Sequence, residues 1–245
     1  MDRIVEITLI GLLSGVIGTG TGGLLAFFIN KNSSKLLGFI LEFSAGLMLA
    51  VVCFDLLPEA FDLGGVSLSC WGVVLGTIII IILDDAVKRA DYVKNSIGNN
   101  ALLKTGVLMA VGISLHNFPE GIAIGSGFEA SIKLGLSIAL VIAVHDIPEG
   151  MAVAVPLRAA GIKGSRVLFL TILSGLPTAV GAFFGVLLGE ISREIIAMCL
   201  GFAGGAMIYI VCSELIPEAK RVHSGRLSSI GNMLGILSGI FVSFI

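Results

Sequence analysis

The sequence predicts an all-α polytopic membrane protein with eight transmembrane helices. Hydrophobic residues make up 56% of the 245 residues, charged residues only 13%, and the mean hydropathy is +1.06. An ordinary soluble domain carries about a quarter charged residues, so a water-soluble globule is excluded. The 33 glycines show no Gly-X-Y period and the four cysteines lie far apart, which excludes collagen-like and disulfide-scaffold classes. The net charge is -2 and the sequence has no basic domain, so it does not predict a nucleic-acid-binding surface.

Eight apolar stretches come near the roughly 20 residues that a helix needs to cross a bilayer. The stretches run from Ile4 to Ile29, Leu36 to Phe61, Gly65 to Leu83, Ala101 to Gly125, Ile132 to Pro156, Val167 to Gly189, Ile195 to Ala219 and Leu227 to Phe244. The first stretch lacks a strongly basic start and a cleavage signal, so we expect a retained helix. The longest polar joint, residues 84–100, is expected to be a loop within a single transmembrane domain, 1–245.

The distribution of basic residues indicates how the spans are oriented. The loops after spans one, three, five and seven hold 12 of the 15 Lys and Arg residues. Because cytoplasmic loops of membrane proteins are enriched in Lys and Arg, we expect these loops in the cytoplasm and both termini outside. A missed or invented span would scramble this alternation, so the basic residues also favour a count of eight.

Two segments of the chain resemble each other. Residues 41–60 and 200–219 are identical at ten of twenty positions, and both end in Pro-Glu-Ala. They belong to spans two and seven, which cross the membrane in opposite senses. Inverted repeats are typical of secondary transporters, whose binding site lies near the midplane. We therefore expect an inverted repeat that relates helices 1–3 to helices 6–8 around helices 4 and 5.

Spans four and five hold the densest group of polar residues. Span four reads HNFPEG over residues 116–121, and span five reads HDIPEG over residues 145–150. In each motif, His and Glu are four residues apart and share one helical face. The glycine after each Glu allows another helix to approach closely. The candidate metal ligands are His116, Asn117, Glu120, His145, Asp146 and Glu149.

A charged side chain at mid-bilayer costs on the order of 3 kcal/mol, so a duplicated set of such side chains indicates a functional role. Imidazole, carboxylate and amide ligands suit a borderline divalent ion such as zinc, iron(II), manganese or cadmium. Two alternatives stay open at this point. The side chains could form hydrogen-bonded pairs that only hold the helices together, or they could relay protons without a metal.

Further acidic residues extend from this centre toward both faces of the membrane. Asp55 and Glu59, four residues apart, lie in the outer part of span two, with Asp62 just beyond them. Glu214 and Glu218 occupy the equivalent positions in the inner part of span seven. Carboxylates in this arrangement indicate a cation pathway. Met48, about two turns deeper than Asp55, could offer a thioether to a soft cation, although a buried methionine is more often a packing residue.

On these motifs the chain resembles the Zrt-/Irt-like (ZIP) metal transporters. The HNFPEG and HDIPEG motifs in adjacent spans carry the resemblance, and the short loop without a histidine run is similar to the prokaryotic members. The resemblance implies a homodimer that takes up a divalent metal into the cytoplasm, usually zinc, with iron, manganese or cadmium as alternatives. It also implies that the six side chains of the two motifs form the metal site.

The same resemblance assigns roles to residues outside the two motifs. Met48 matches a methionine that completes the primary site in some bacterial members. Asp62 matches an acidic residue at the outer entrance, and Glu214 belongs to the inner exit path. With zinc as the substrate, no catalytic cofactor is expected.

The chain departs from the family pattern at two positions. Where the sixth span of relatives often reads SGLPEP, this chain has Ser174-Gly175-Leu176-Pro177-Thr178, and Thr178 is a weaker ligand than a carboxylate. We therefore expect one well-occupied site with at most a weak neighbour. Asp55 stands where many relatives carry His, and this harder ligand favours iron or manganese somewhat over zinc.

The sequence predicts a permease that works by alternating access, and not an enzyme. Spans one, four, five and six are expected to move against spans two, three, seven and eight, passing the ion along Asp55, Glu59, Asp62, Thr178, Glu214 and Glu218. The alternative is an intramembrane zinc-dependent hydrolase, in which the metal activates water. The absence of H-E-x-x-H disfavours it, and the absence of GxxxxGK[ST] disfavours ATP hydrolysis. A proton-coupled exporter would differ only in direction.

Overall fold

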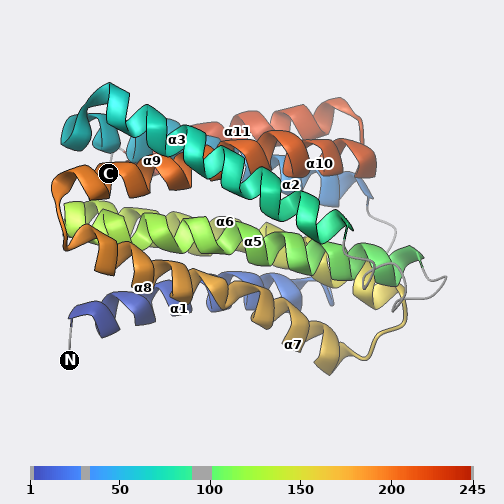
Figure 1. The fold of residues 1–245 in the computed structure, drawn as a ribbon. Coiled ribbons are helices and arrows are strands. Elements are labelled where there is room, and N and C mark those ends of the chain that lie inside the picture. Colours follow the sequence, from blue (N-terminus) through green and yellow to red (C-terminus); the bar gives the residue numbers. More distant parts are fainter. Residues whose placement is uncertain (1–2, 29–33, 90–100, 244–245) are drawn as a thin grey trace.

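A computed structural model describes residues 3–28, 34–89 and 101–243, and helices dominate these residues (Figure 1). Two π-helical segments, η1 and η2, each lie between two α-helices and continue them. In chain order the elements are α1 (Arg3–Leu25), α2 (Ser34–Val51), η1 (Val52–Leu56), α3 (Leu57–Arg89), α5 (Ala101–Ala130), α6 (Ile132–Ala159), α7 (Gly164–Gly175), α8 (Pro177–Gly189), α9 (Arg193–Ile210), η2 (Val211–Leu215), α10 (Ile216–Val222) and α11 (Arg226–Ser243).

The helices pack in two groups that lie against each other. In one group α1 packs on α6 and α5 packs on both α6 and α8; in the other, α3 packs on α9 and α2 on α11. Contacts of α5 with α9 and of α2 with α6 join the groups. The start of α1 and the end of α11 lie at the same end of the bundle, which we call the termini end (Figure 1). The other end is called the opposite end.

Among the described residues, six segments are long and apolar enough to span a membrane. They are Arg3–Leu25, Ser34–Ala86, Gly106–Ala130, Ile132–Ala159, Gly164–Gly189 and Arg193–Val222. This number differs from the expected eight for two reasons. The second and third predicted spans run together in one 53-residue stretch, and the last predicted span, which corresponds to α11, is not among the six.

The 53-residue stretch folds back on itself at Gly65. Gly65 has φ 73° and ψ 163°, a conformation outside the helical region that glycine adopts without strain. The Ser69 hydroxyl donates a hydrogen bond of 2.7 Å to the carbonyl oxygen of Ala60, nine residues earlier, which bridges the two sides of this reversal. A straight helix of this length would also far exceed the bilayer thickness. The break falls in the predicted joint between Phe61 and Gly65.

The predicted loop at residues 84–100 is wrong in its first part, because α3 continues to Arg89. Asp84 is buried and accepts a hydrogen bond from the Tyr209 hydroxyl at 3.3 Å, so this acidic residue packs inside the protein. Because Asp84 has a hydrogen-bond partner inside the protein, its polarity does not require the helix to end there. The remainder of the predicted loop, residues 90–100, lies outside the described residues.

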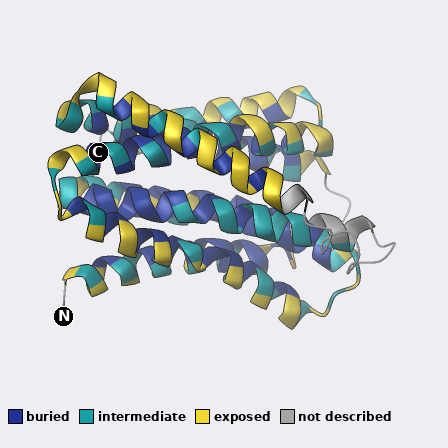
Figure 2. Cartoon of the chain, viewed as in Figure 1, coloured by how far each residue is buried: buried dark blue, intermediate teal, exposed yellow. Residues whose placement is uncertain are grey.

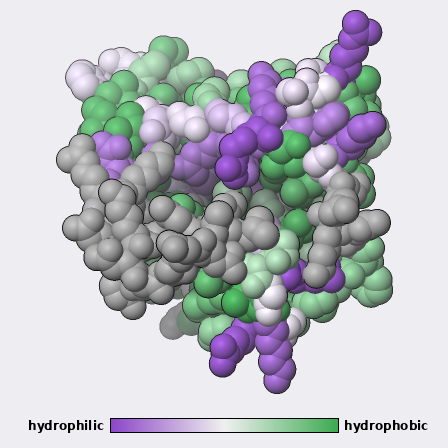
Figure 3. All heavy atoms as spheres, turned by 90° about the vertical axis from the view of Figure 1, so that its right-hand side faces the viewer, coloured by the Kyte–Doolittle hydropathy of each residue, from purple (hydrophilic) through white to green (hydrophobic). Residues whose placement is uncertain are grey.

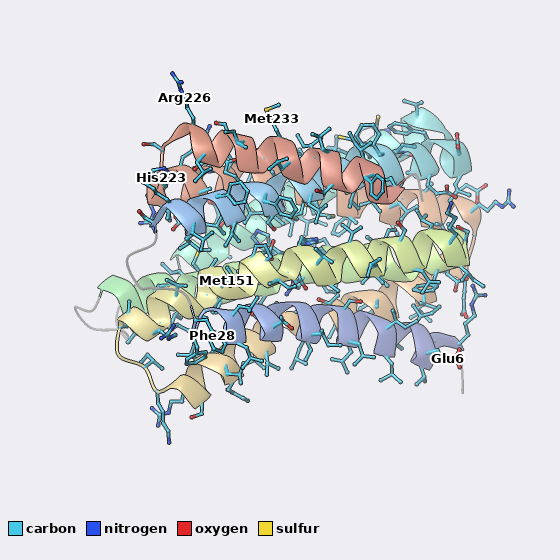
Figure 4. All side chains as sticks on the ribbon, turned by 180° about the vertical axis from the view of Figure 1, so that it is seen from behind. Glu6, Phe28, Met151, His223, Arg226 and Met233 are labelled. Carbon is cyan, nitrogen blue, oxygen red and sulfur yellow. The ribbon has the colours of Figure 1, made fainter. Side chains whose placement is uncertain are left out.

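Burial distinguishes the central helices from the peripheral ones. Much of α6 is buried, whereas α3 presents large apolar side chains such as Trp71, Ile78 and Ile82 outward (Figure 2). An apolar outer surface suits a lipid environment. At the opposite end, hydrophilic side chains gather beside apolar flanks (Figure 3). His223 and Arg226 lie at that end and Glu6 at the termini end (Figure 4).

Close helix packing holds the two motif-bearing helices in place. A Cβ atom on Gly121 would lie 2.1 Å from the carbonyl oxygen of Thr178, and one on Gly150 would lie 2.1 Å from that of Thr19. Only glycine lets the backbones approach so closely, as the motifs predicted. The Glu residue before each glycine is thereby held within the bundle.

Candidate metal site

Three side chains from α5 and α6 form a compact group inside the bundle, here called the central site: Glu120, His145 and Glu149. One oxygen or nitrogen atom from each lies within 4.8 Å of those from the other two, and all three side chains are fully buried. His145 Nε2 lies 2.9 Å from Glu120 Oε1. The i, i+4 spacing in the α6 motif directs His145 and Glu149 to the same face of the helix.

Both motif histidines are oriented in the same way by their own helices. His116 Nδ1 lies 2.6 Å from the carbonyl oxygen of Gly112, and His145 Nδ1 lies 3.2 Å from that of Val141. In each case the carbonyl belongs to the residue four positions earlier. A backbone carbonyl at one ring nitrogen is the usual arrangement that directs the other nitrogen of a histidine toward a metal.

Many buried polar atoms in and around the central site lack a hydrogen-bond partner among the described residues. They include both carboxylate oxygens of Asp146 and of Glu149, together with Glu120 Oε2, His116 Nε2, Asn117 Oδ1 and Thr178 Oγ1. A buried polar atom without a partner is costly, and a buried charge without a counter-charge is more so. A bound cation would satisfy several of these atoms together.

The other motif residues surround the central site without joining the three-residue group. Asp146 Oδ1 lies 3.5 Å from His145 Nε2, which places this third buried carboxylate next to the ring. Asn117 Nδ2 donates a hydrogen bond of 2.7 Å to the Ser174 carbonyl, so its amide oxygen is left available. Thr178 is fully buried at the start of α8, and its hydroxyl is directed to the α1 backbone near Gly15.

A cavity of about 290 Å³ extends from the bundle interior toward the opposite end. This opposite-end cavity is lined by Asp84, His116, Glu214, Glu218 and Arg221, among other residues. His116 Nε2 lies 3.7 Å from Glu214 Oε2 across it. The sequence grouped His116 with the other five motif ligands, whereas the structure directs its free nitrogen toward Glu214.

A second cavity of about 530 Å³ lies at the termini end. This termini-end cavity is lined by Asp55, Glu59, Lys133, Ser137 and Ser243, among other residues. Neither cavity is lined by a central-site residue, but the opposite-end cavity reaches the motif residue His116 and the termini-end cavity reaches no motif residue. The predicted pathway residues Asp55 and Glu59 therefore line one cavity, and Glu214 and Glu218 line the other. Asp62 is exposed at the termini end, just before the turn at Gly65.

Three residues at these cavities had no functional role assigned from the sequence: Ser243, Asp84 and Arg221. The Ser243 hydroxyl donates a 2.8 Å hydrogen bond to Asp55 Oδ2. Because 188 positions separate the two residues, no local sequence pattern predicts this hydrogen bond. Asp84 was assigned to a loop, yet it lines the opposite-end cavity. Arg221 pairs with Glu218, and their i, i+3 spacing was the available sequence signal. Met48 is fully buried in α2, which packs on α6.

The chemistry of the central site is that of a cation-binding centre within a membrane-embedded bundle. One imidazole and two carboxylates offer the nitrogen and oxygen ligands that zinc and neighbouring transition metals accept. The fold and the site thus define an integral membrane protein with a buried group of side chains that could hold a divalent metal ion.

Sequence comparisons identify the family. The profile described as "ZIP Zinc transporter" matches residues 99–245. The chain is 33% identical to the zinc transporter ZupT of Akkermansia muciniphila over 96% of each chain, and 35% identical to ZupT of Corynebacterium glutamicum over 92% of each. It is also 37% identical to the zinc transporter GufA of Myxococcus xanthus, over 68% of this chain and 66% of that protein. The chain belongs to the ZIP family.

Proposed function

We propose that the protein carries zinc across the membrane into the cytoplasm through the central site. The observation that supports this most strongly is the clustering of Glu120, His145 and Glu149 in the bundle interior, with carboxylate oxygens that lack hydrogen-bond partners within the described part of the chain. Three of the relatives are named zinc transporters, and each of the two ZupT proteins aligns over more than nine-tenths of its length. Iron, manganese and cadmium are the alternative substrates that the same ligand types accept.

The proposed topology has eight spans. The turn at Gly65 divides the 53-residue stretch into two crossings, and α11 provides the last one. An inverted repeat is supported by the two π-helical segments, because Val52–Leu56 and Val211–Leu215 fall at the same positions of the similar segments 41–60 and 200–219. π-Bulges occur frequently at functional sites. Each segment carries one pathway carboxylate, Asp55 or Glu214.

In the proposed orientation the opposite end faces the cytoplasm and both termini lie outside. The excess of Lys and Arg in the loops of that end supports it. The opposite-end cavity reaches the motif residue His116 and the termini-end cavity reaches no motif residue, which supports the proposal that the structure is in an inward-facing state. Movement of the group containing α1, α5, α6, α7 and α8 against the other group would expose the central site to the outside.

The proposed ligand set is Glu120, His145 and Glu149, with Asp146 and Asn117 beside them and Met48 contributing a thioether. Because Thr178 is a weaker ligand than a carboxylate, a second metal site next to the central site is at most weak, and one ion is bound at a time. We place the protein in a prokaryotic cytoplasmic membrane as a homodimer. The hydrolase alternative is not supported, since the relatives are named for transport.

Zinc uptake by liposomes that contain the purified protein tests this function. The wild type is expected to show saturable uptake, and Glu120→Ala/Glu149→Ala is expected to lose it while still inserting into the membrane. The matched control is Glu190→Ala/Glu194→Ala, which removes the same charge from exposed positions outside the central site. Saturable uptake by the central-site variant at the wild-type rate would contradict the proposal.

A further inference from the structure

The two cavities present their carboxylates in the same pattern. Asp55 and Glu59 line the termini-end cavity, and Glu214 and Glu218 line the opposite-end cavity. In each pair the first carboxylate belongs to a π-helical segment and the second follows four residues later. All four residues are half-buried. Apart from Asp84, which lines the opposite-end cavity and accepts a hydrogen bond from Tyr209, the carboxylates of the two mouths are matched up to this point of the repeat.

The match ends after Ala60 and Ala219: Phe61 corresponds to Lys220, and the following residue, three positions after the second carboxylate, also differs. At the termini end this residue is Asp62, and at the opposite end it is Arg221. Arg221 Nε and Nη2 donate hydrogen bonds of 2.7 Å to Glu218 Oε2 and Oε1, respectively. Both oxygens of the Glu218 carboxylate are thus engaged by one guanidinium, a geometry that lysine cannot reproduce.

The termini-end cavity has a basic residue of its own, but it is used differently. Lys133 lines that cavity together with Asp55 and Glu59. Among the described residues, no ion pair within 4.0 Å joins Lys133 to either carboxylate, and the Asp55 carboxylate instead accepts a hydrogen bond from Ser243. A carboxylate that a guanidinium already holds is a poorer ligand for a divalent cation than one that only a hydroxyl contacts.

We propose that Arg221 is a positioning residue that keeps the opposite-end mouth a weak binding site for the transported cation. Arg221 holds the Glu218 carboxylate. A cation that has passed His116 and Glu214 therefore has one carboxylate fewer to bind and is released toward the cytoplasm. The inference rests on the proposed function. It assigns the directional difference between the two mouths to the exchange of Asp62 for Arg221, which lies just beyond the similar segments and next to the exchange of Phe61 for Lys220.

The position of Arg221 makes this role testable without loss of the fold. Its side chain is 65% exposed, and exposed ion pairs contribute little to stability. Arg221→Asp restores the acidic residue of the other repeat and releases Glu218. Arg221→Gln releases Glu218 without adding a charge, and serves as a second variant. Arg226→Asp is the matched control, because Arg226 is exposed at the same end of the bundle and does not line the cavity (Figure 4).

The first experiment measures zinc binding to the purified chain by equilibrium dialysis in the Glu120→Ala/Glu149→Ala background, in which the central site is disabled. Adding Arg221→Asp is expected to tighten zinc binding by about tenfold or more, because ligand charge sets the affinity of such sites. Arg221→Gln should tighten it less, and Glu218→Gln should cancel part of the gain. The Arg226→Asp control should leave zinc binding unchanged. Unchanged binding in both Arg221 variants would overturn the inference.

The second experiment measures zinc uptake with the central site intact. Arg221→Asp is expected to lower the maximal rate by about fivefold or more and to lower the half-saturating zinc concentration outside along with it, because tighter binding at the exit slows release, a step that follows uptake from outside. Normal uptake by Arg221→Asp beside saturable wild-type uptake would overturn this inference alone. Absence of saturable uptake in the wild type would instead overturn the proposed function, whatever the dialysis result.

Discussion

Replacing Glu149 with glutamine is expected to stabilise the metal-free protein and to abolish its stabilisation by zinc. Glu149 is fully buried, and neither of its oxygens has a hydrogen-bond partner among the described residues. Its ligand atom lies within 4.8 Å of that of Glu120, and Asp146 adds a third buried carboxylate nearby. In the absence of a cation these carboxylates repel one another. Glutamine has the same shape without the charge.

The size of the effect follows from the distance between the charges. Two unit charges no more than 4.8 Å apart repel by at least about 3 kcal/mol at an effective dielectric constant of about 20. Proton uptake by the metal-free site relieves part of this repulsion, so we expect Glu149→Gln to stabilise the metal-free protein by about 1–3 kcal/mol. For a chain of this length that corresponds to a rise in melting temperature of about 2–10 °C.

Zinc should stabilise the wild type and leave the stability of Glu149→Gln almost unchanged. At a zinc concentration one hundred times the dissociation constant, the wild type should gain about 2.7 kcal/mol. Glu149→Gln should gain almost nothing at the same concentration, because one of the three central-site ligands is lost. The assay is thermal unfolding of the detergent-solubilised protein with and without zinc, followed by the loss of the monodisperse peak in size-exclusion chromatography.

Glu190→Gln is the control for this prediction, because it removes a charge from an exposed position. It should leave both the metal-free melting temperature and the zinc-induced shift unchanged. The reasoning fails if Glu149→Gln melts below the wild type without metal, or if zinc stabilises the variant as strongly as it stabilises the wild type.

Three further predictions concern the surroundings of the central site. Gly150→Ala should destabilise the protein by about 1–3 kcal/mol in the same thermal assay, because its Cβ would lie 2.1 Å from the Thr19 carbonyl oxygen; an unchanged melting temperature would contradict the packing described above. Thr178→Ala should change the half-saturating zinc concentration for uptake less than twofold, and a larger change would make Thr178 a ligand. Ser243→Ala should lower that concentration by up to about fivefold, since releasing Asp55 from a hydrogen bond is worth about 1 kcal/mol, whereas a rise would show that Ser243 assists binding.

The central site could be predicted largely from local spacing. His145 and Glu149 are four residues apart in one helix, and this spacing alone directs them to one face. Glu120 joins them because α5 packs on α6, which two adjacent copies of one motif suggest. The glycines that follow the two Glu residues predicted the close approach of neighbouring helices. In these cases a sequence pattern of a few residues is enough to predict which side chains lie together and which backbones approach closely.

The features that escaped prediction depend on the register between distant helices. The turn of His116 toward Glu214 and the hydrogen bond from Ser243 to Asp55 join residues far apart in the chain. Hydropathy also placed Asp84 in a loop, because a hydropathy pattern reports polarity without reporting that Tyr209 supplies a partner. The apolar stretches were easier to predict, since about 20 apolar residues suffice for a span, and six spanning segments are found among the described residues; the count of eight stays a prediction.

The central claim is that the transported zinc ion binds among Glu120, His145 and Glu149. Anomalous diffraction at the zinc edge from crystals of the zinc-loaded protein tests it most directly. We predict one strong peak in the bundle interior, about 2.0–2.2 Å from a His145 nitrogen and from oxygens of both Glu residues. A strongest peak elsewhere in the molecule, with no anomalous density between α5 and α6, would contradict the account.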